Sequence, residues 1–215
     1  MKSWYKSFAE LNAVERNGVA FRLQVKHRKS DCVIIAPHGG GIEPGTSEIA
    51  SAIAGCSYSL YTFDGVRLSG NELLHITSTL FDEPKCLHLI RSAGHVLAIH
   101  GCEGAEPIIL VGGLYLELGD RIIAALQEAG FKAVKATTSF EGTQPENICN
   151  RGKSGRGVQL EISEGLRRSM FKGLDRNDRR ETRPPFRIFI KAIRKAIRSE
   201  GLGPTGLGCL LEHEF

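Results

Sequence analysis

A histidine and a glutamate frame a run of glycines directly after an apolar segment, in the stretch His38-Gly-Gly-Gly-Ile-Glu43. Three consecutive glycines cost chain entropy unless the backbone must turn sharply or approach another group closely. Histidine and glutamate on such a turn can converge on one metal ion, and imidazole with carboxylate suits zinc. A phosphate-binding loop is the alternative, but no lysine follows the glycines and the spacing matches neither known glycine-rich pattern. The segment therefore indicates a metal site.

A second apolar segment also ends in histidine and glycine, at Val96–His100 followed by Gly101. Because side chains alternate along a strand, His95 and His100 face opposite sides, and only His100 stands at the carboxyl end. We expect it beside His38. Two strand-end histidines and a glutamate would leave a fourth position open for water, as in catalytic zinc sites.

Glu161 lies inside the apolar run Val158–Ile162. Burying an unpaired carboxylate costs free energy, so this side chain should have either an ion-pair partner or a catalytic role. A metal-activated water needs a general base within hydrogen-bond reach, and a carboxylate is the usual choice. A salt bridge to an arginine such as Arg167 is the alternative. Asn150 and Arg151, just ahead of this run, could clamp a substrate carboxylate through the planar fork of arginine.

A sheet must bring these distant residues together. Short apolar runs predict strands at Phe21–Val25, Cys32–Ala36, Ser59–Phe63, Val96–His100, Ile108–Val111, Ala133–Ala136 and Val158–Ile162. Helical spacing with proline or glycine at the ends predicts helices at Ser47–Ala54, Pro84–Ala93, Leu116–Ala129 and Pro184–Ser199. Alternating strands and helices predict an α/β fold with parallel strands, whose carboxyl ends collect ligands.

The composition predicts one globular domain. The chain has 215 residues, of which 41% are hydrophobic and 24% charged. We assign 1–200 to the domain and 201–215 to a loose, glycine-rich tail. Six scattered cysteines without a C-x-x-C pair indicate reduced thiols. With neither a signal-peptide core nor an apolar stretch of membrane-spanning length, the expected location is the cytoplasm.

Positive charge is concentrated in residues 151–200, which hold 15 Lys and Arg against 6 Asp and Glu. Such a region could face nucleic acid, a membrane surface or a polyanionic substrate. A solvated helix face is the alternative. The predicted helix at 184–199 carries an apolar stripe for the core and places Arg187, Lys191, Arg194 and their neighbours on a basic outer face.

Five segments taken together resemble the poly-γ-glutamate hydrolase family. They are His38–Glu48, Leu74–Ser78, Ala98–Gly101, Asn147–Gly152 and Gly157–Glu161, and they occur in order within residues 5–197. The family is known from bacteriophages that strip host capsules and has many bacterial chromosomal members. The resemblance implies a zinc amidohydrolase with a single-domain open α/β sandwich, a mixed, largely parallel sheet flanked by helices, related to the zinc carboxypeptidases.

The resemblance also implies roles for individual residues. His38, Glu43 and His100 match the ligands of one zinc ion, and Glu161 matches the catalytic glutamate. Arg151 aligns with the arginine that binds the substrate carboxylate or polarises the carbonyl. Further substrate-binding candidates are Asn150, Lys153, Arg156 and His75.

One spacing departs from the broader carboxypeptidase pattern, in which two residues separate the first histidine from the glutamate. Four residues separate His38 from Glu43 here, so Glu48 is the alternative ligand. We expect Glu48 instead in the first turn of the following helix.

The resulting hypothesis is zinc-assisted hydrolysis of γ-glutamyl amide bonds, with poly-γ-glutamate as the expected substrate. An amidohydrolase for small N-acyl amino acids or γ-glutamyl compounds is the first alternative, and a non-catalytic basic nucleic-acid binder the second. No nucleic-acid motif is present, and we expect no nucleic-acid or membrane partner. We expect a monomer that binds an acidic polymer or small molecule, cytoplasmic unless a phage-encoded copy is released on lysis.

Overall fold

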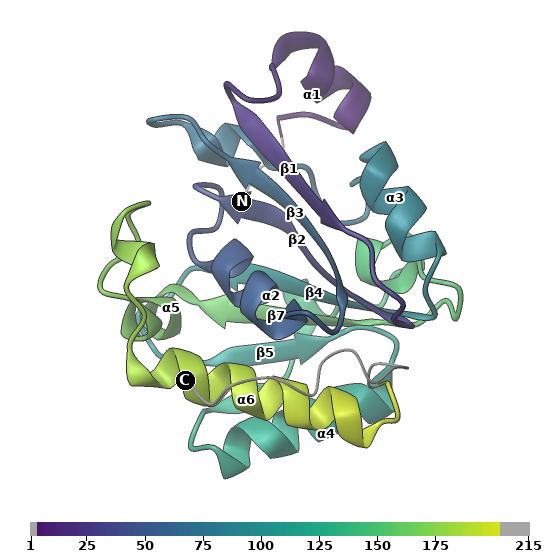
Figure 1. Ribbon diagram of the computed structural model, residues 1–215, viewed down its shortest axis with the longest axis vertical. Helices are drawn as coiled ribbons and strands as arrows, with labels where there is room; N and C mark the ends of the chain where they lie inside the picture. Colours follow the sequence, from purple (N-terminus) through teal and green to yellow (C-terminus); the bar gives the residue numbers. More distant parts are fainter. Residues whose placement is uncertain (1–3, 203–215) are drawn as a thin grey trace.

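A mixed sheet of seven strands forms the centre of the molecule (Figure 1). The computed structural model describes residues 4–202. The strands are β1 (Phe21–Lys26), β2 (Cys32–Gly40), β3 (Ser59–Gly65), β4 (His95–Cys102), β5 (Ile109–Gly112), β6 (Ala133–Lys135) and β7 (Val158–Ser163). Their order is β1-β3-β2-β4-β7-β5-β6, with antiparallel pairing only between β1 and β3 and between β5 and β7. The expected largely parallel sheet and its seven strands are confirmed.

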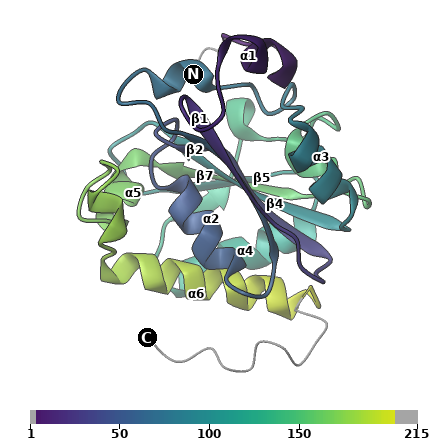
Figure 2. The ribbon, with the colours of Figure 1, turned by 45° about the horizontal axis from the view of Figure 1, so that its top comes forward.

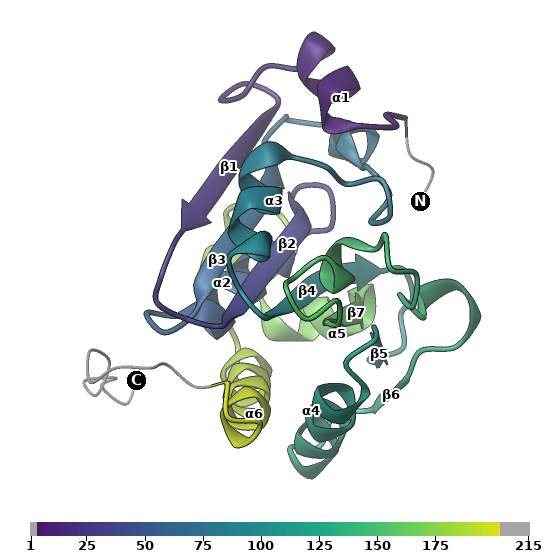
Figure 3. The same ribbon diagram turned by 90° about the vertical axis from the view of Figure 1, so that its right-hand side faces the viewer.

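Helices cover both faces of this sheet. The α-helices are α1 (Phe8–Val14), α2 (Thr46–Ala54), α3 (Pro84–Arg91), α4 (Leu116–Glu128), α5 (Glu164–Met170) and α6 (Pro184–Ser199). The short 3-10 helices are η1 (Asn71–Leu74), η2 (Thr138–Phe140), η3 (Ile148–Asn150) and η4 (Asp178–Arg180). In Figures 2 and 3, α6 runs beside α4, and α2 crosses the same face of the sheet.

Two apolar cores result, one on each face. The first core unites α2, α4, α5 and α6 with one face of the sheet, and the second packs α1, α3 and η3 on the other face. Side chains of β2 alternate between them: Ile34 and Ala36 enter the first core, whereas Val33 and Ile35 enter the second. The parity of a strand residue therefore decides which core it faces.

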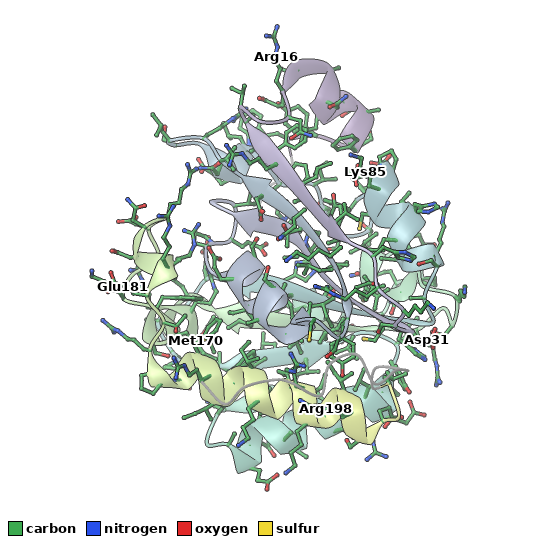
Figure 4. All side chains as sticks on the ribbon, viewed as in Figure 1. Arg16, Asp31, Lys85, Met170, Glu181 and Arg198 are labelled. Atoms are coloured by element: carbon green, nitrogen blue, oxygen red, sulfur yellow. The ribbon has the colours of Figure 1, made fainter. Side chains whose placement is uncertain are left out.

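The parallel strands give the sheet an amino edge and a carboxyl edge. Asp31, which precedes β2, marks the amino edge, and the segment of Glu181 lies on the opposite side of the molecule, beyond the carboxyl ends of β2, β4 and β7 (Figure 4). Ligands of open α/β sheets collect at the carboxyl edge.

The amphipathic helix predicted at 184–199 is confirmed as α6, and its Phe189, Ile193 and Ile197 are fully buried in the first core. Arg194 departs from the expected basic outer face. It is buried, its guanidinium lies 6.0 Å from the ring centre of Tyr58, and it therefore belongs to the packing of the helix.

Other expectations from the sequence need amendment. Cys32, Cys86, Cys102 and Cys149 are free thiols, but Cys56 is disulfide-bonded, which corrects the expectation of reduced thiols for that residue. None of the helices within residues 4–202 has the length and apolarity that a membrane span requires. Residues 203–215 of the expected tail lie outside the described part of the chain.

The glycines after β2 are required by close backbone approach. The Cβ of an alanine at Gly39 would overlap the hydroxyl of Ser47 and the carboxylate of Asp64. Gly40 has a φ of +64°, and a Cβ there would overlap the carbonyl of Gly65 in β3. The chain can therefore turn tightly along β3 and still bring the following residues over the sheet edge.

Gly39→Ala is expected to lower the free energy of unfolding by about 2 kcal/mol or more, because the added methyl overlaps buried polar groups. Gly119→Ala in α4 is the matched control, since its Cβ would meet only Val111, at 3.6 Å. Alanine favours a helix over glycine by about 1 kcal/mol, so this variant should be more stable than the wild type. Urea unfolding of both variants measures the contrast, and equal stability of the two would contradict it.

Candidate metal centre

His38 reaches the site because β2 changes its register just before it. Pairing with β3 shifts between Ala36 and Gly39, whereas strict alternation from Ile34 and Ala36 would point His38 into the first core. Its ring instead lies on the side of the second core, 6.2 Å from the ring of Phe81. This places His38 on the same face of the sheet as His100.

Three side chains from two strands and one loop converge at the carboxyl edge. The Nδ1 atom of His38 lies 3.0 Å from Oε1 of Glu43 and 3.2 Å from Nδ1 of His100. Nδ1 of His100 lies 3.8 Å from Oε2 of Glu43. All three residues are buried. The structure therefore brings together the three predicted ligands.

The hydrogen bonds around this trio leave its lone pairs facing one another. Nε2 of His38 lies 2.7 Å from the carbonyl oxygen of Ile76, and since a carbonyl only accepts, Nε2 carries the proton. The Nδ1 of a neutral His38 then presents a lone pair to the carboxylate of Glu43 and to His100. A metal ion or a proton can lie between these atoms, and the backbone carbonyl of Ile76 selects the tautomer of His38 whose Nδ1 can bind a metal.

The spacing suits a small tetrahedral ion. Donor atoms about 2.05 Å from such an ion lie about 3.3 Å from one another. The distances within the trio range from 3.0 to 3.8 Å. Two imidazoles and one carboxylate are a ligand set that zinc uses in catalytic sites. The donor set therefore fits zinc.

Charge and burial act in opposite directions on this trio. Burial opposes ionisation of Glu43, but the charges of His38 and His100 and the backbone N–H of Gly101, 2.8 Å from Oε2, lower its pKa to about 2. Burial lowers the pKa of His100 to about 4. An ionised Glu43 beside a neutral His100 is the form in which these two residues can bind a metal ion.

His75 lies beside the same centre. Its ring is tilted against the ring of His38 at 4.0 Å between centres, and its Nε2 lies 4.0 Å from Oε1 of Glu43. His38, Glu43 and His75 offer donor atoms within 4.8 Å of one another. This set is looser than the trio with His100, which we take as the ligand set because its distances match a tetrahedral ion.

Glu161 faces the same centre from β7. It pairs in register with His100 of β4, so both side chains lie on one face of the sheet. Burial and the negative charge of Glu43 raise the pKa of Glu161 to about 8, against the lowering effect of Arg167. Within residues 4–202 its carboxylate makes no ion pair, so the salt bridge considered as an alternative is absent there.

Arg167 has a different task. Its buried guanidinium donates to the carbonyls of Pro44, Cys102 and Ile162, at 2.6, 3.0 and 3.0 Å. These carbonyls follow β2, end β4 and lie in β7, so one side chain ties together the three carboxyl ends that carry the site. Glu48, the alternative ligand, lies in the first turn of α2 and pairs with Arg179 at 2.8 Å, away from the trio.

A cavity of about 520 Å³ opens above the trio. Besides the trio it is lined by His75 and Glu161, and by hydroxyl and amide side chains of Thr77, Ser78, Thr79, Gln144, Asn147 and Gln159. No lysine or arginine of the described chain belongs to this lining. Its ionisable side chains are histidines, Cys102 and the carboxyl groups of Glu43, Glu103 and Glu161, so the cavity offers neutral donors and carboxylates but no lysine or arginine.

Asn150 holds a wall of the cavity instead of facing it. Its buried amide donates to the carbonyls of Gly142 and Gln144, at 2.7 and 2.9 Å, and accepts from the backbone N–H groups of Leu114 and Gly157. The amide has no capacity left for a substrate. The structure thus does not bring Asn150 into the cavity as expected.

Arg151 is also directed away from the cavity. Its Nη1 donates to the carbonyl of Phe81 at 2.9 Å, and the neighbouring N–H of Ile148 donates to the carbonyl of Ser78 at 2.9 Å. Both bonds secure the segment 75–81, which forms the opposite wall. Arg151 and Asn150 therefore support the two walls, and neither belongs to the lining.

Lys153 and Arg156 lie at the amino edge of the sheet. The backbone N–H of Lys153 donates to Ala93, just before β4, and Arg156 lies 4.6 Å over the ring of Tyr115 and 3.6 Å from Glu117. A loop that precedes a strand enters at its amino end, so neither side chain reaches the carboxyl edge. This corrects their expected place beside the substrate.

Two further residues of the cavity, Gln159 and Asn147, were not among the site residues predicted from the sequence. The amide nitrogen of Asn147 donates to Oε1 of Gln159 at 2.9 Å, and both residues line the cavity. Gln159 lies two residues before Glu161 in β7. Because side chains alternate along a strand, this spacing places both side chains on the same face of the sheet. Asn147 has no such signal, because it lies in an irregular segment.

Comparisons with known proteins identify the family of the chain. A model of the poly-gamma-glutamate hydrolase family matches residues 5–192. The SPbeta prophage-derived protein YoqZ of Bacillus subtilis is 40% identical over 169 residues, which are 78% of this chain and 61% of YoqZ. YndL of the same organism is 38% identical over 169 residues, or 78% of this chain and 66% of YndL. The matched chain thus spans less than two thirds of either relative.

Solved structures give the same result. The structure of a bacteriophage poly-gamma-glutamate hydrolase has a TM-score of 0.91 and 36% identity, and the match covers 93% of this chain and 99% of that chain. A zinc-free apo structure of YndL has a TM-score of 0.88 and 34% identity, with the same coverage.

The raised pKa of Glu161 predicts a pH dependence of stability in the metal-free protein. The folded state holds the proton to about pH 8 and the unfolded state releases it near 4.5, so stability is lost as the pH rises between these values. Each pKa unit of difference corresponds to about 1.4 kcal/mol. Glu161→Gln cannot titrate, so its stability relative to the wild type should increase with pH. Urea unfolding of chelator-treated proteins from pH 5 to 8 tests this, and parallel pH curves would contradict it.

Proposed function

Because the chain belongs to the poly-gamma-glutamate hydrolase family, we propose that it is a zinc-dependent hydrolase that cleaves γ-glutamyl amide bonds of an acidic polymer, poly-γ-glutamate. One observation carries the proposal. His38, Glu43 and His100 converge with distances of 3.0 to 3.8 Å, and Glu161 faces them in register across β4 and β7. A metal-ligand trio beside a buried carboxylate is the arrangement that metal-assisted amide hydrolysis requires.

His38, Glu43 and His100 would hold one zinc ion. When bound, zinc supplies Lewis-acid polarisation of the amide carbonyl and makes a neighbouring water more acidic. The chain orients these ligands through backbone groups: the carbonyl of Ile76 holds His38, and the N–H of Gly101 holds Glu43. Such outer contacts fix the ring orientation and the carboxylate before any ligand arrives.

Glu161 would move the proton of the reaction. Its carboxylate accepts a proton from the attacking water and passes it to the leaving nitrogen of the amide. Burial and the negative charge of Glu43 raise its pKa, which makes the ionised carboxylate a stronger base than an exposed one. Its position in the cavity lining gives a substrate access to it.

The substrate carboxylates would be bound by neutral donors. Each residue of poly-γ-glutamate carries a free α-carboxylate, and the cavity offers hydroxyl groups from Thr77, Ser78 and Thr79 and the amides of Gln144 and Asn147. Hydroxyl and amide groups can donate to a carboxylate without the charge of lysine or arginine. Lys153 and Arg156 take no part in this binding, because they lie at the amino edge of the sheet.

A second cavity favours a polymer over a small γ-glutamyl compound. This cavity of about 450 Å³ lies toward α5 and shares Glu43, Gly101, Cys102 and Glu103 with the first. The two cavities adjoin at Glu43, so together they leave room for a longer substrate than the first cavity alone. A small compound would need only one of them.

Zinc is expected to raise the melting temperature of the chelator-treated protein, because it binds the folded trio and not the unfolded chain. His38→Ala should abolish this rise and lower the zinc content after dialysis. His27→Ala is the matched control. His27 is exposed and follows the end of β1, which pairs with the start of β3 at the amino edge of the sheet, away from the trio. Elemental analysis and thermal unfolding measure both effects. Full zinc content in His38→Ala would remove this residue from the ligand set.

Glu161→Gln is expected to lower the rate of polymer cleavage by about 10²–10⁴-fold, because the amide cannot accept the proton. The zinc content should be retained, since Glu161 is not in the ligand trio. Glu117→Gln, an exposed substitution in α4 at the amino edge, is the control and should leave cleavage unchanged. Gel analysis of poly-γ-glutamate digests follows the reaction. A zinc-loaded Glu161→Gln with wild-type activity would contradict the role of Glu161.

A further inference from the structure

The cavity lacks the cationic group that the reaction would use beside the metal. An amide carbonyl gains negative charge on its oxygen as water attacks, and a positioned donor stabilises that charge. The resemblance gave this task to Arg151, but the guanidinium of Arg151 donates to Phe81 and is not part of the cavity lining. The lining within residues 4–202 holds no other arginine and no lysine. The adjoining second cavity contains Arg167, which is already bonded to three backbone carbonyls, and Arg168, which pairs with Glu164. The donors that the first cavity offers for this task are therefore neutral groups.

His75 has the position that this donor needs. It lines the cavity, its ring lies tilted against that of His38 at 4.0 Å between centres, and its Nε2 lies 4.0 Å from Oε1 of Glu43. That distance is slightly longer than the distances of 3.0 to 3.8 Å within the trio. His75 thus borders the ligand trio at the wall of the cavity that a substrate would enter.

His75 is also held on a rigid segment. The carbonyl of Ile76, next in the chain, accepts from His38, and the carbonyls of Ser78 and Phe81 accept from Ile148 and Arg151. These three bonds connect the segment 75–81 to β2 and η3. A donor mounted in this way keeps its orientation during the reaction, which is what makes such a donor effective.

We propose that His75 is a further catalytic residue, whose Nε2–H donates a hydrogen bond to the carbonyl oxygen of the scissile amide. It takes the place that the resemblance assigned to Arg151, and Arg151 becomes a positioning residue that supports the segment of His75. The inference rests on the proposed function, because it concerns the same hydrolysis. No bond to His75 forms or breaks, and its proton stays on Nε2 throughout.

The test compares His75→Ala and His75→Gln with the wild type, each loaded with zinc. Removing one such donor lowers kcat by about 10²–10³-fold in other enzymes, so we expect a loss of that size in His75→Ala with KM nearly unchanged. His75→Gln should recover part of the activity, because its amide N–H can replace Nε2–H. The zinc affinity of both variants, measured by competition with a chelator, should stay within about threefold of the wild type.

A second readout does not depend on turnover. A phosphinate that replaces the scissile amide of a γ-glutamyl dipeptide carries the tetrahedral, negatively charged oxygen of the transition state. Calorimetry should show its affinity falling at least about tenfold in His75→Ala, because that oxygen loses its donor. Unchanged phosphinate affinity would overturn the proposal.

Other results would also decide the question. A loss of zinc affinity in His75→Ala as large as that in His100→Ala would make His75 a ligand and overturn the proposal. So would a wild-type kcat in His75→Ala together with a large loss in Arg151→Lys. A zinc-loaded wild type that cleaves no γ-glutamyl amide would instead refute the proposed function, and the role of His75 with it.

Discussion

The change of register in β2 is the feature on which the rest of the site depends. Side chains alternate along a strand, and the alternation of Val33 to Ala36 would place His38 in the first core, among apolar groups. The irregularity between Ala36 and Gly39 moves it to the face that carries His100 and Glu161. The glycines that follow allow it, because Gly39 and Gly40 pack where any Cβ would overlap β3 or its neighbours. The same turn then delivers Glu43 to the trio.

A converged trio of donors needs support from outside, since buried polar groups are costly when their positions are not fixed. Backbone groups of Ile76 and Gly101 orient His38 and Glu43, and the guanidinium of Arg167 joins the three strand ends. The segment 147–151 plays the same part for the cavity walls. Its amides hold residues 140–144, and Ile148 and Arg151 hold residues 75–81. Many of the polar residues near the site therefore hold neighbouring backbone segments in place and do not contact a substrate.

Residues on strands could be placed from the sequence, and residues on loops could not. The seven strands follow from apolar runs. The positions of His100 and Glu161 near the ends of two such runs were enough to place both residues at one edge of the sheet. Helices α1 and α5 were missed because each has only seven residues, too few for a clear periodic pattern. Asn150 and Arg151 precede β7, so sequence proximity to Glu161 suggested a shared site. The backbone contacts that direct them elsewhere depend on the fold and leave no mark in the sequence.

Part of the positive charge of residues 151–200 has a structural explanation, and none of its lysines or arginines lines the first cavity. Arg167, Arg179 and Arg194 are buried and bind backbone carbonyls, Glu48 and Ser57. The basic side chains of α6 that remain exposed lie on the helix surface, across the sheet from the second core. A cavity with neutral donors binds each carboxylate of the proposed polymer more weakly than arginine would, since charge-assisted hydrogen bonds are about twice as strong as neutral ones. Weak binding of each unit suits an enzyme that must release long products. Stabilisation then comes mainly from the transition state, in which negative charge develops on the carbonyl oxygen beside His38, His75 and Glu161.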